Sequence, residues 1–291
     1  MTLGIRCLAC CATLLLTAPP VAAQQRINAG HGLNPSGLIR IWSGSGSLRI
    51  VGWDRDSVSV SGTIPRGRRF HLGGSRAGIK AAIDLMEESD VAHLEVRVPR
   101  RSQVWVKTAA SDVVASGLSG GLDVYTVTGN VTVSGNLGAA SLESMGGTVA
   151  VSGSVESLRA KTASGDLRLS GTSEDAVATT VSGTIRLDGA RFQRGRFESV
   201  DGRIVYAGAV PPGSGLVLET HSGGVEFALP RGTAGEFTVH TLRGEIRNEL
   251  ATSVPVRRSS PARKLDFTLG TANGTQVNVR SFRGSVVLRR Q

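Results

Sequence analysis

The sequence predicts an all-β fold, a parallel β-solenoid with coils of about 18–21 residues between strand-rich N- and C-terminal capping sections. Three observations support this prediction. Apolar residues alternate with polar ones in short runs, a pattern typical of strands with one buried face. A glycine recurs between two such runs at a nearly constant spacing, and a second glycine follows six residues later. A hydroxyl side chain lies three residues before each recurring glycine.

The repeats occupy residues 104–248. A single repeat cannot bury its apolar stripe, whereas stacked repeats can, so we expect each repeat to form one coil of two short strands. We expect a positive φ at the recurring glycine, which would let the chain turn sharply. We call these residues the corner glycines, with a serine in the first place; they are Ser111, Gly129, Gly147, Gly165, Gly183, Gly202, Gly223 and Gly244, and the pattern returns at Gly284 and loosely at Gly46.

The hydroxyl position is the most uniform of the repeat. Stacked coils would align these side chains in a ladder, where they can bond to each other or to the backbone of the corner. A nucleophile is needed once in an enzyme, so ten copies favour a structural role. The residues concerned are Ser43, Thr108, Thr126, Ser144, Thr162, Thr180, Ser199, Thr220, Thr241 and Ser281.

Residues 1–23 have the features of a secretory signal peptide. Arg6 precedes an apolar run over residues 8–18, and small residues lead up to Gln24. All three cysteines lie in this segment, so the mature chain is expected to lack disulfides and thiolate metal sites. The sequence therefore predicts an exported protein in the periplasm, on the cell surface or secreted, with no transmembrane segment in the mature chain.

Two further sections flank the repeats. Residues 24–103 contain several alternating runs, the last of which ends at Pro99, and we expect them to form an N-terminal β capping section over the first coil. Residues 249–291 are expected to form a loop, rich in proline and arginine, and then a C-terminal closing coil.

Basic residues suggest one candidate surface. The chain carries a net charge of +10, and arginines occur in loops and at outward positions of neighbouring repeats. They could contact an acidic glycan or another envelope polyanion. A general preference for arginine explains them equally well, because 29 of the 33 basic residues are Arg. The candidate contacts are Arg66, Arg68, Arg69, Arg168, Arg186, Arg257 and Arg258.

Several motifs resemble those of a known family. They are Ile41-Trp42-Ser43-Gly44-Ser45-Gly46, Gly52-Trp53-Asp54-Arg55-Asp56, Val96-Arg97-Val98-Pro99, the repeated Ser-Gly units and Ser281-Phe282-Arg283-Gly284-Ser285-Val286. With these motifs the sequence resembles the bacterial DUF4097, or "putative adhesin", β-strand-repeat family over nearly all of the mature chain. The resemblance implies a repetitive β architecture and an adhesin-like role, and it supplies no catalytic residues.

Catalytic and metal sites are not evident. Glycoside hydrolysis needs two carboxylates roughly 5 to 9.5 Å apart. In the position after the corner glycine, Asp112 and Asp166 would lie three coils apart, about 14 Å at the strand spacing. Asp188 and Asp201 could approach each other only through the corner geometry. The five histidines show no ligand spacing.

The sequence thus predicts a non-enzymatic, exported β-solenoid of the cell envelope with no cofactor. It would act as a binding, adhesin-like or scaffolding surface for an envelope protein or an acidic glycan. Nucleic acid is not expected, because the chain is exported and its basic residues are not interleaved with aromatic ones. The alternative is a polysaccharide-active lyase or hydrolase on the same fold. The oligomeric state is left open.

Overall fold

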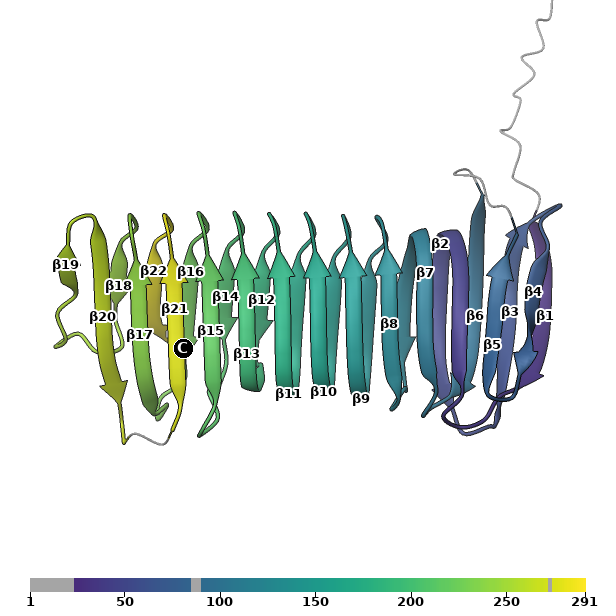
Figure 1. Cartoon of the computed structure of the whole chain (residues 1–291), viewed down its shortest axis with the longest axis horizontal. Helices are drawn as coiled ribbons and strands as arrows, with labels where there is room; N and C mark the ends of the chain where they lie inside the picture. Colours follow the sequence, from purple (N-terminus) through teal and green to yellow (C-terminus); the bar gives the residue numbers. More distant parts are fainter. Residues whose placement is uncertain (1–23, 85–89, 272–273) are drawn as a thin grey trace, which may run out of the picture.

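The computed structural model describes residues 24–84, 90–271 and 274–291. The predicted signal peptide lies outside the described residues. Within them the secondary structure consists of β-strands, stacked along one long axis (Figure 1). The all-β prediction is confirmed. In the described part of the chain, no helix is long and apolar enough to cross a membrane.

The strands follow one another closely. The N-terminal section contains β1 (Gln24–Gly32), β2 (Leu38–Trp53), β3 (Ser57–Pro65), β4 (Phe70–Ser75), β5 (Gly78–Ile83) and β6 (Val91–Pro99). The repeats contain β7 (Gln103–Ser116), β8 (Gly121–Thr126), β9 (Val131–Ser144), β10 (Val149–Thr162), β11 (Leu167–Thr180), β12 (Ile185–Asp188), β13 (Arg191–Ser199), β14 (Ile204–Ala207), β15 (Gly215–Thr220), β16 (Val225–Leu229), β17 (Gly235–Thr241) and β18 (Ile246–Asn248). The C-terminal section contains β19 (Arg257–Ser259), β20 (Ala262–Leu269), β21 (Gln276–Ser281) and β22 (Val286–Arg290).

The repeats run across two faces of the molecule. The front face in Figure 1 holds β8, β13, β15, β21 and β17, and the back face holds β12, β14, β16, β22 and β18. Long strands such as β9, β10 and β11 bend and contribute one half to each face. Parallel neighbours are in matching register: Val131 pairs with Val149, and Val149 with Leu167. Equivalent positions of successive repeats therefore form rows along the stack.

The inward-facing side chains of both faces fill one core. In the coils of β9 to β12 this core consists of Val, Leu, Ala and Ile. In the wider coils that follow, Phe197, Tyr206 and Phe227 are fully buried. Tyr206 and Phe227 pack with ring centroids 4.7 Å apart. The extra residues in these coils thus accompany larger side chains in the core.

The corner glycines are required for a different reason from the one predicted. A positive φ is wrong for Gly129 through Gly244; it occurs instead at second glycines such as Gly135 (118°) and Gly153 (105°). At the corners the coils approach closely. A Cβ atom on Gly183 would lie 1.8 Å from the carbonyl oxygen of Gly165 in the preceding coil. The row of corner glycines therefore allows the stacked backbones to touch.

The hydroxyl row has the predicted structural role. In the repeats these side chains are buried, and Thr180 Oγ1 accepts a hydrogen bond from the N–H of Gly183 at 3.1 Å. The same hydroxyl donates to the carbonyl of Gly165 at 3.4 Å. Ser144 likewise accepts from Gly147 at 2.9 Å and donates to Gly129 at 2.9 Å. Each such hydroxyl ties its own corner to the backbone beneath it, so the row is part of the fold.

The sheet is mixed, which corrects the prediction of a wholly parallel solenoid. Antiparallel pairs occur at both ends of the stack: β1 with β3, β3 with β6 and β4 with β5 at one end, and β17 with β20 and β19 with β20 at the other. Antiparallel hairpins at the ends cover edges that a stack of parallel coils would leave unpaired.

The C-terminal coil does not close the stack. Strand β21 lies between β15 and β17, and β22 lies between β16 and β18. The end is formed instead by the hairpin of β19 and β20, in a segment predicted to begin as a loop (Figure 1). The last repeat of the sequence therefore inserts between two earlier ones, since each repeat offers the same pairing edges to its neighbours.

Candidate binding site

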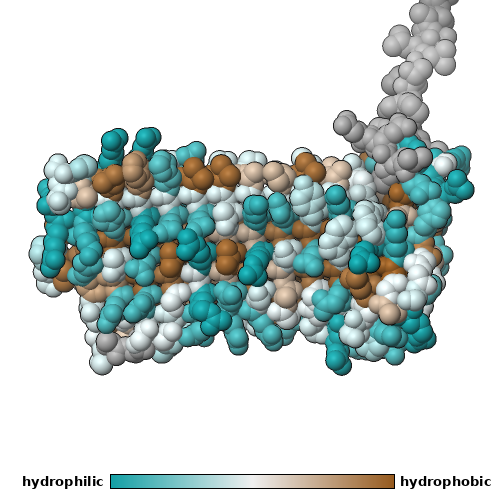
Figure 2. Space-filling view, viewed as in Figure 1, coloured by the Kyte–Doolittle hydropathy of each residue, from teal (hydrophilic) through white to brown (hydrophobic). Residues whose placement is uncertain are grey.

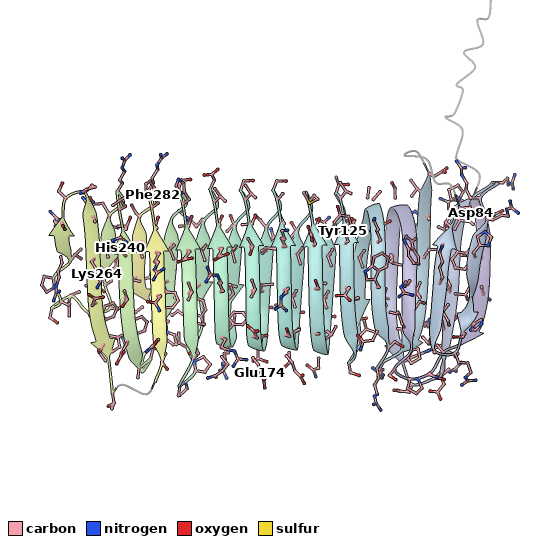
Figure 3. All side chains as sticks on the ribbon, in the orientation of Figure 1. Asp84, Tyr125, Glu174, His240, Lys264 and Phe282 are labelled. Atoms are coloured by element: carbon pink, nitrogen blue, oxygen red, sulfur yellow. The ribbon has the colours of Figure 1, made fainter. Side chains whose placement is uncertain are left out.

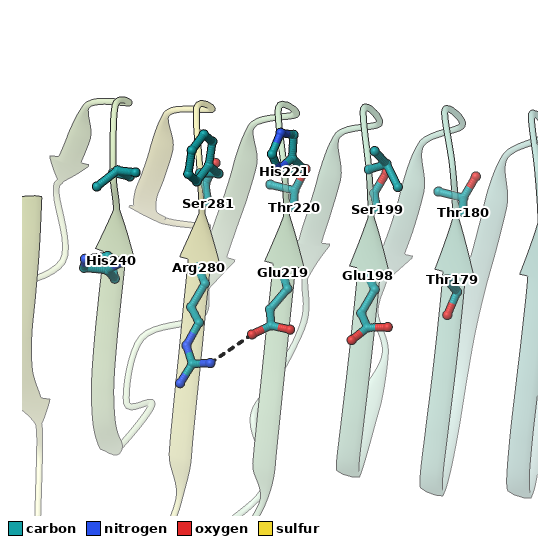
Figure 4. Close-up of a pocket in the computed structure, with 13 residues that line it drawn as sticks. Thr179, Thr180, Glu198, Ser199, Glu219, Thr220, His221, His240, Arg280 and Ser281 are labelled. Carbon is teal, nitrogen blue, oxygen red and sulfur yellow. Dashed lines mark hydrogen bonds and ion pairs between the residues drawn. The ribbon is translucent and has the colours of Figure 1, made fainter. Parts of the chain in front are cut away.

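A hollow of about 490 Å³ lies on the front face, where β11, β13, β15, β21 and β17 end at the corners (Figure 4). Its floor consists of side chains that precede the hydroxyl row, and its rim consists of side chains that follow this row. Glu198, Glu219 and Arg280 belong to the floor, and His221 and Phe282 belong to the rim.

The floor holds the carboxylate pair that a sugar-cleaving enzyme would need. Glu198 and Glu219 are direct partners on β13 and β15. Both are bound by arginines: Arg196 contacts Glu198 and Glu219, the latter at 3.3 Å, and Arg280 contacts Glu219 at 3.1 Å. A general acid must hold its proton near neutral pH, whereas neighbouring guanidiniums favour the ionised carboxylate. The arrangement therefore suits a salt-bridged surface better than acid catalysis.

The sequence analysis missed this pair. It compared only the position after each corner glycine, where Asp112 and Asp166 are separated by two intervening coils. The signal lies in the position before each hydroxyl, which reads Thr179, Glu198, Glu219 and, in spatial order, Arg280. An alignment of that position would have shown the adjacent carboxylates, although not the arginine that follows them in space.

The rim is apolar and aromatic. The His221 and Phe282 rings stack in parallel with centroids 4.8 Å apart. Phe282 projects from the upper edge of the stack, whereas His240 lies lower, on the front face (Figure 3). The rim is one end of a longer row, formed by the residue that follows each buried hydroxyl. We call it the corner row; in spatial order it contains Ala109, Val127, Met145, Ala163, Val181, Val200, His221, Phe282 and Leu242.

The corner row holds most of the exposed large apolar side chains of the described residues. Val127, Met145, Val181 and Val200 are 42–49% exposed, and only Val91 and Val114 elsewhere are comparable. Figure 2 shows hydrophobic residues recurring along the upper edge of the molecule. The apolar stripe therefore extends well beyond the hollow.

The arginines predicted to contact a polyanion do not gather in one place. Arg66, Arg68 and Arg69 lie between β3 and β4 at the N-terminal end. Arg257 and Arg258 lie on β19 at the opposite end, more than ten strands away (Figure 1). In the N-terminal group Arg68 already donates to Asp90 at 2.7 Å. A single patch of all seven arginines is excluded by these positions.

Arg168 and Arg186 are neighbours, as the repeat pattern predicts. They pair directly across β11 and β12 on the back face, and both are about half exposed. Each has a carboxylate nearby: Asp166 lies 3.2 Å from Arg168, and Asp188 lies 3.9 Å from Arg186. Such exposed pairs contribute little to stability, so both arginines stay available to solvent.

Metal binding has no candidate among the described residues, where no group of three or more His, Cys, Asp or Glu side chains could hold an ion. The hollow therefore offers charge, aromatic surface and backbone polar groups for binding.

Comparisons with known proteins place this architecture in a family. No curated protein matches the sequence. Among solved structures, a "putative adhesin" from Parabacteroides distasonis is 12% identical, with a TM-score of 0.53 over 92% of this chain and 97% of the other. A second from Parabacteroides merdae is 10% identical, with a TM-score of 0.53 over 92% and 96%. At these identities the likeness extends to the fold alone. The family model described as Toastrack DUF4097 matches residues 42–284, and the chain therefore belongs to this family.

Proposed function

We propose that the protein is a non-enzymatic, exported binding protein of the cell envelope, adhesin-like or scaffolding in role, which docks a partner protein along the corner row. The observation that carries this proposal is the exposure of Val127, Met145, Val181 and Val200 at equivalent positions. Exposed apolar stripes on soluble proteins mark contact sites. The export rests on the signal peptide that the sequence predicts.

The geometry of the row favours a helical segment of the partner. Successive coils are about 4.8 Å apart, so Val127 and Val200 are separated by roughly 19 Å. A helix rises 5.4 Å per turn, so an apolar stripe with one contact per turn stays close to register over four coils. The hydroxyls and glycines beside the row leave room for such a helix, because they project little from the corner.

The alternative, a polysaccharide lyase or hydrolase, has weaker support. Its strongest feature is the pair of Glu198 and Glu219, which arginines bind on both sides. Two ionised carboxylates without a protonated partner lack the general acid that glycoside hydrolysis uses.

Site-specific cross-linking tests the proposal. A photoreactive amino acid replaces Val181 in the corner row or, as a matched control, Val114 on β7, which is 42% exposed. Residues 24–291 are then irradiated with envelope extracts. We expect discrete protein adducts from position 181 that are absent from position 114, and loss of these adducts when Met145 and Val200 are both replaced by Asp. Equal labelling from both positions would refute a dedicated docking row.

A further inference from the structure

A second hollow, of about 420 Å³, lies at the C-terminal end of the stack. It is formed between the hairpin of β19 and β20 and the corner that follows β17. Three arginines line it: Arg243 from the corner, Arg258 from β19 and Arg263 from β20. The remaining lining residues, Ser260, Pro261 and Ala262, are small and carry no charge. The hollow thus concentrates positive charge.

The arginines are incompletely paired. Arg263 contacts Glu245 at 2.7 Å and donates to the carbonyl of Gly244 at 2.8 Å, but its Nε is buried without a hydrogen-bond partner. Within the described chain no ion pair involves Arg243 or Arg258. One carboxylate therefore faces three guanidiniums.

The backbone keeps these like charges close. Arg258 and Arg263 are direct partners across β19 and β20. Like charges directly opposite each other in a sheet destabilise it, unless an anion lies between them. The adjoining corner adds to the effect: Arg243 and Arg283 lie 6.0 and 5.8 Å from the ring centre of Phe282. The local excess of positive charge is built into secondary structure and not confined to flexible surface side chains.

We infer that this hollow binds a phosphomonoester group. A guanidinium presents paired N–H donors that match oxyanions. A phosphomonoester has three terminal oxygens and a double charge, which fits three converging arginines better than a carboxylate does. The volume leaves room for a group the size of a sugar beside the phosphate. The phosphate could belong to a soluble phosphosugar or to a lipid headgroup.

Binding of defined probes to residues 24–291 tests the inference. Calorimetry compares glucose 6-phosphate and inorganic phosphate with galacturonate as the carboxylate control. Vesicles of phosphatidylcholine with and without phosphatidic acid form the lipid arm. We expect the double variant R243Q/R258Q to bind glucose 6-phosphate at least tenfold more weakly than the unmodified chain. Arg263 is left in place because it contacts the backbone of the corner.

The matched control is R168Q/R186Q, which removes the same charge from neighbouring, exposed arginines on the back face. This variant should bind as the unmodified chain does. Binding of both phosphate and glucose 6-phosphate supports the site, and binding of phosphatidic acid vesicles in addition identifies a lipid headgroup as a source. Absence of phosphate binding, equally tight galacturonate binding, equal losses in both variants, or binding to vesicles alone would overturn it. Unchanged thermal unfolding shows that R243Q/R258Q remains folded.

Discussion

Gly183→Ala tests whether close contact between corners holds the stack together. The added Cβ would lie 1.8 Å from the carbonyl oxygen of Gly165 and 2.5 Å from its carbonyl carbon. Ordinary contact requires the two coils to separate locally by roughly 1.5 Å. Both partners are backbone atoms, so no side chain can rotate away to relieve the overlap.

The expected cost follows from the contacts at this corner. A separation of that size would break the hydrogen bonds from the N–H groups of Val181 and Ser182 to the carbonyl of Ala163, which measure 3.2 and 3.0 Å. Each such bond contributes about 1 kcal/mol. Overpacking adds about 1–3 kcal/mol. We therefore expect Gly183→Ala to lower the free energy of unfolding by about 3–5 kcal/mol.

Two other glycines provide the controls. Gly146 lies in the neighbouring corner, and a Cβ there would meet its nearest atom at 3.7 Å, so Gly146→Ala should change stability by less than about 0.5 kcal/mol. Gly189 has a φ of 63° but open space around it, so Gly189→Ala should cost about 1–2 kcal/mol through backbone strain alone.

Urea unfolding of residues 24–291, followed by circular dichroism, measures the three variants. Repeat proteins can unfold in segments, so the slope of each transition has to be compared with that of the unmodified chain before free energies are calculated. Crowding predicts the order Gly183→Ala, Gly189→Ala, Gly146→Ala from most to least destabilised. The reasoning fails if Gly183→Ala is as stable as Gly146→Ala.

Three further changes probe the core. Tyr206→Phe should cost about 1 kcal/mol at pH 8, because the buried hydroxyl donates to the carbonyl of Ala209 at 2.7 Å. Burial raises the pKa of Tyr206 above its unfolded value of 10.0, so this tyrosine's contribution is intact below pH 10 and is lost as the pH rises further; urea midpoints should show the difference between the two proteins shrinking, and a constant difference would contradict the assignment. Thr180→Val should cost about 1–3 kcal/mol in urea unfolding, since the N–H of Gly183 loses its acceptor, and a neutral effect would remove the hydroxyl row from the stability argument. Phe237→Ala should cost about 3–5 kcal/mol and increase hydrogen exchange in β20, because the ring stacks on Phe267 at 5.0 Å; unchanged exchange would show that the hairpin is held otherwise.

The repeat pattern of the sequence predicted which residues become neighbours where the stack follows chain order. Thr162 and Thr180 align across β10 and β11, and Arg168 aligns with Arg186 across β11 and β12. The prediction succeeds because parallel pairing in constant register turns a spacing of 18 residues into direct contact. It required no knowledge of side-chain packing.

The same pattern could not place the last repeat. Strand β22 pairs Val286 with Val225 on one side and with Ile246 on the other. A sequence jump of 40 residues between Gly244 and Gly284 shows that chain order is interrupted, but not which edge the returning repeat joins. That choice depends on the hairpin of β19 and β20, which pairs with β17 and so occupies the far edge. The pairing of Arg258 with Arg263 follows from this hairpin and was equally hidden.

The rows differ in what the fold demands of them. Buried rows, such as the corner glycines and the hydroxyls, are fixed by close approach and hydrogen bonding, so their uniformity needs no function. Packing makes no such demand on Val127, Met145, Val181 and Val200, which are close to half exposed. The next residue of each corner is just as exposed to the same solvent, yet it varies between Ser182, Asp201 and other types. Repetition alone therefore does not explain the apolar character of the corner row. Contact with a partner does, and this is why we base the proposed function on the corner row and not on the flat faces.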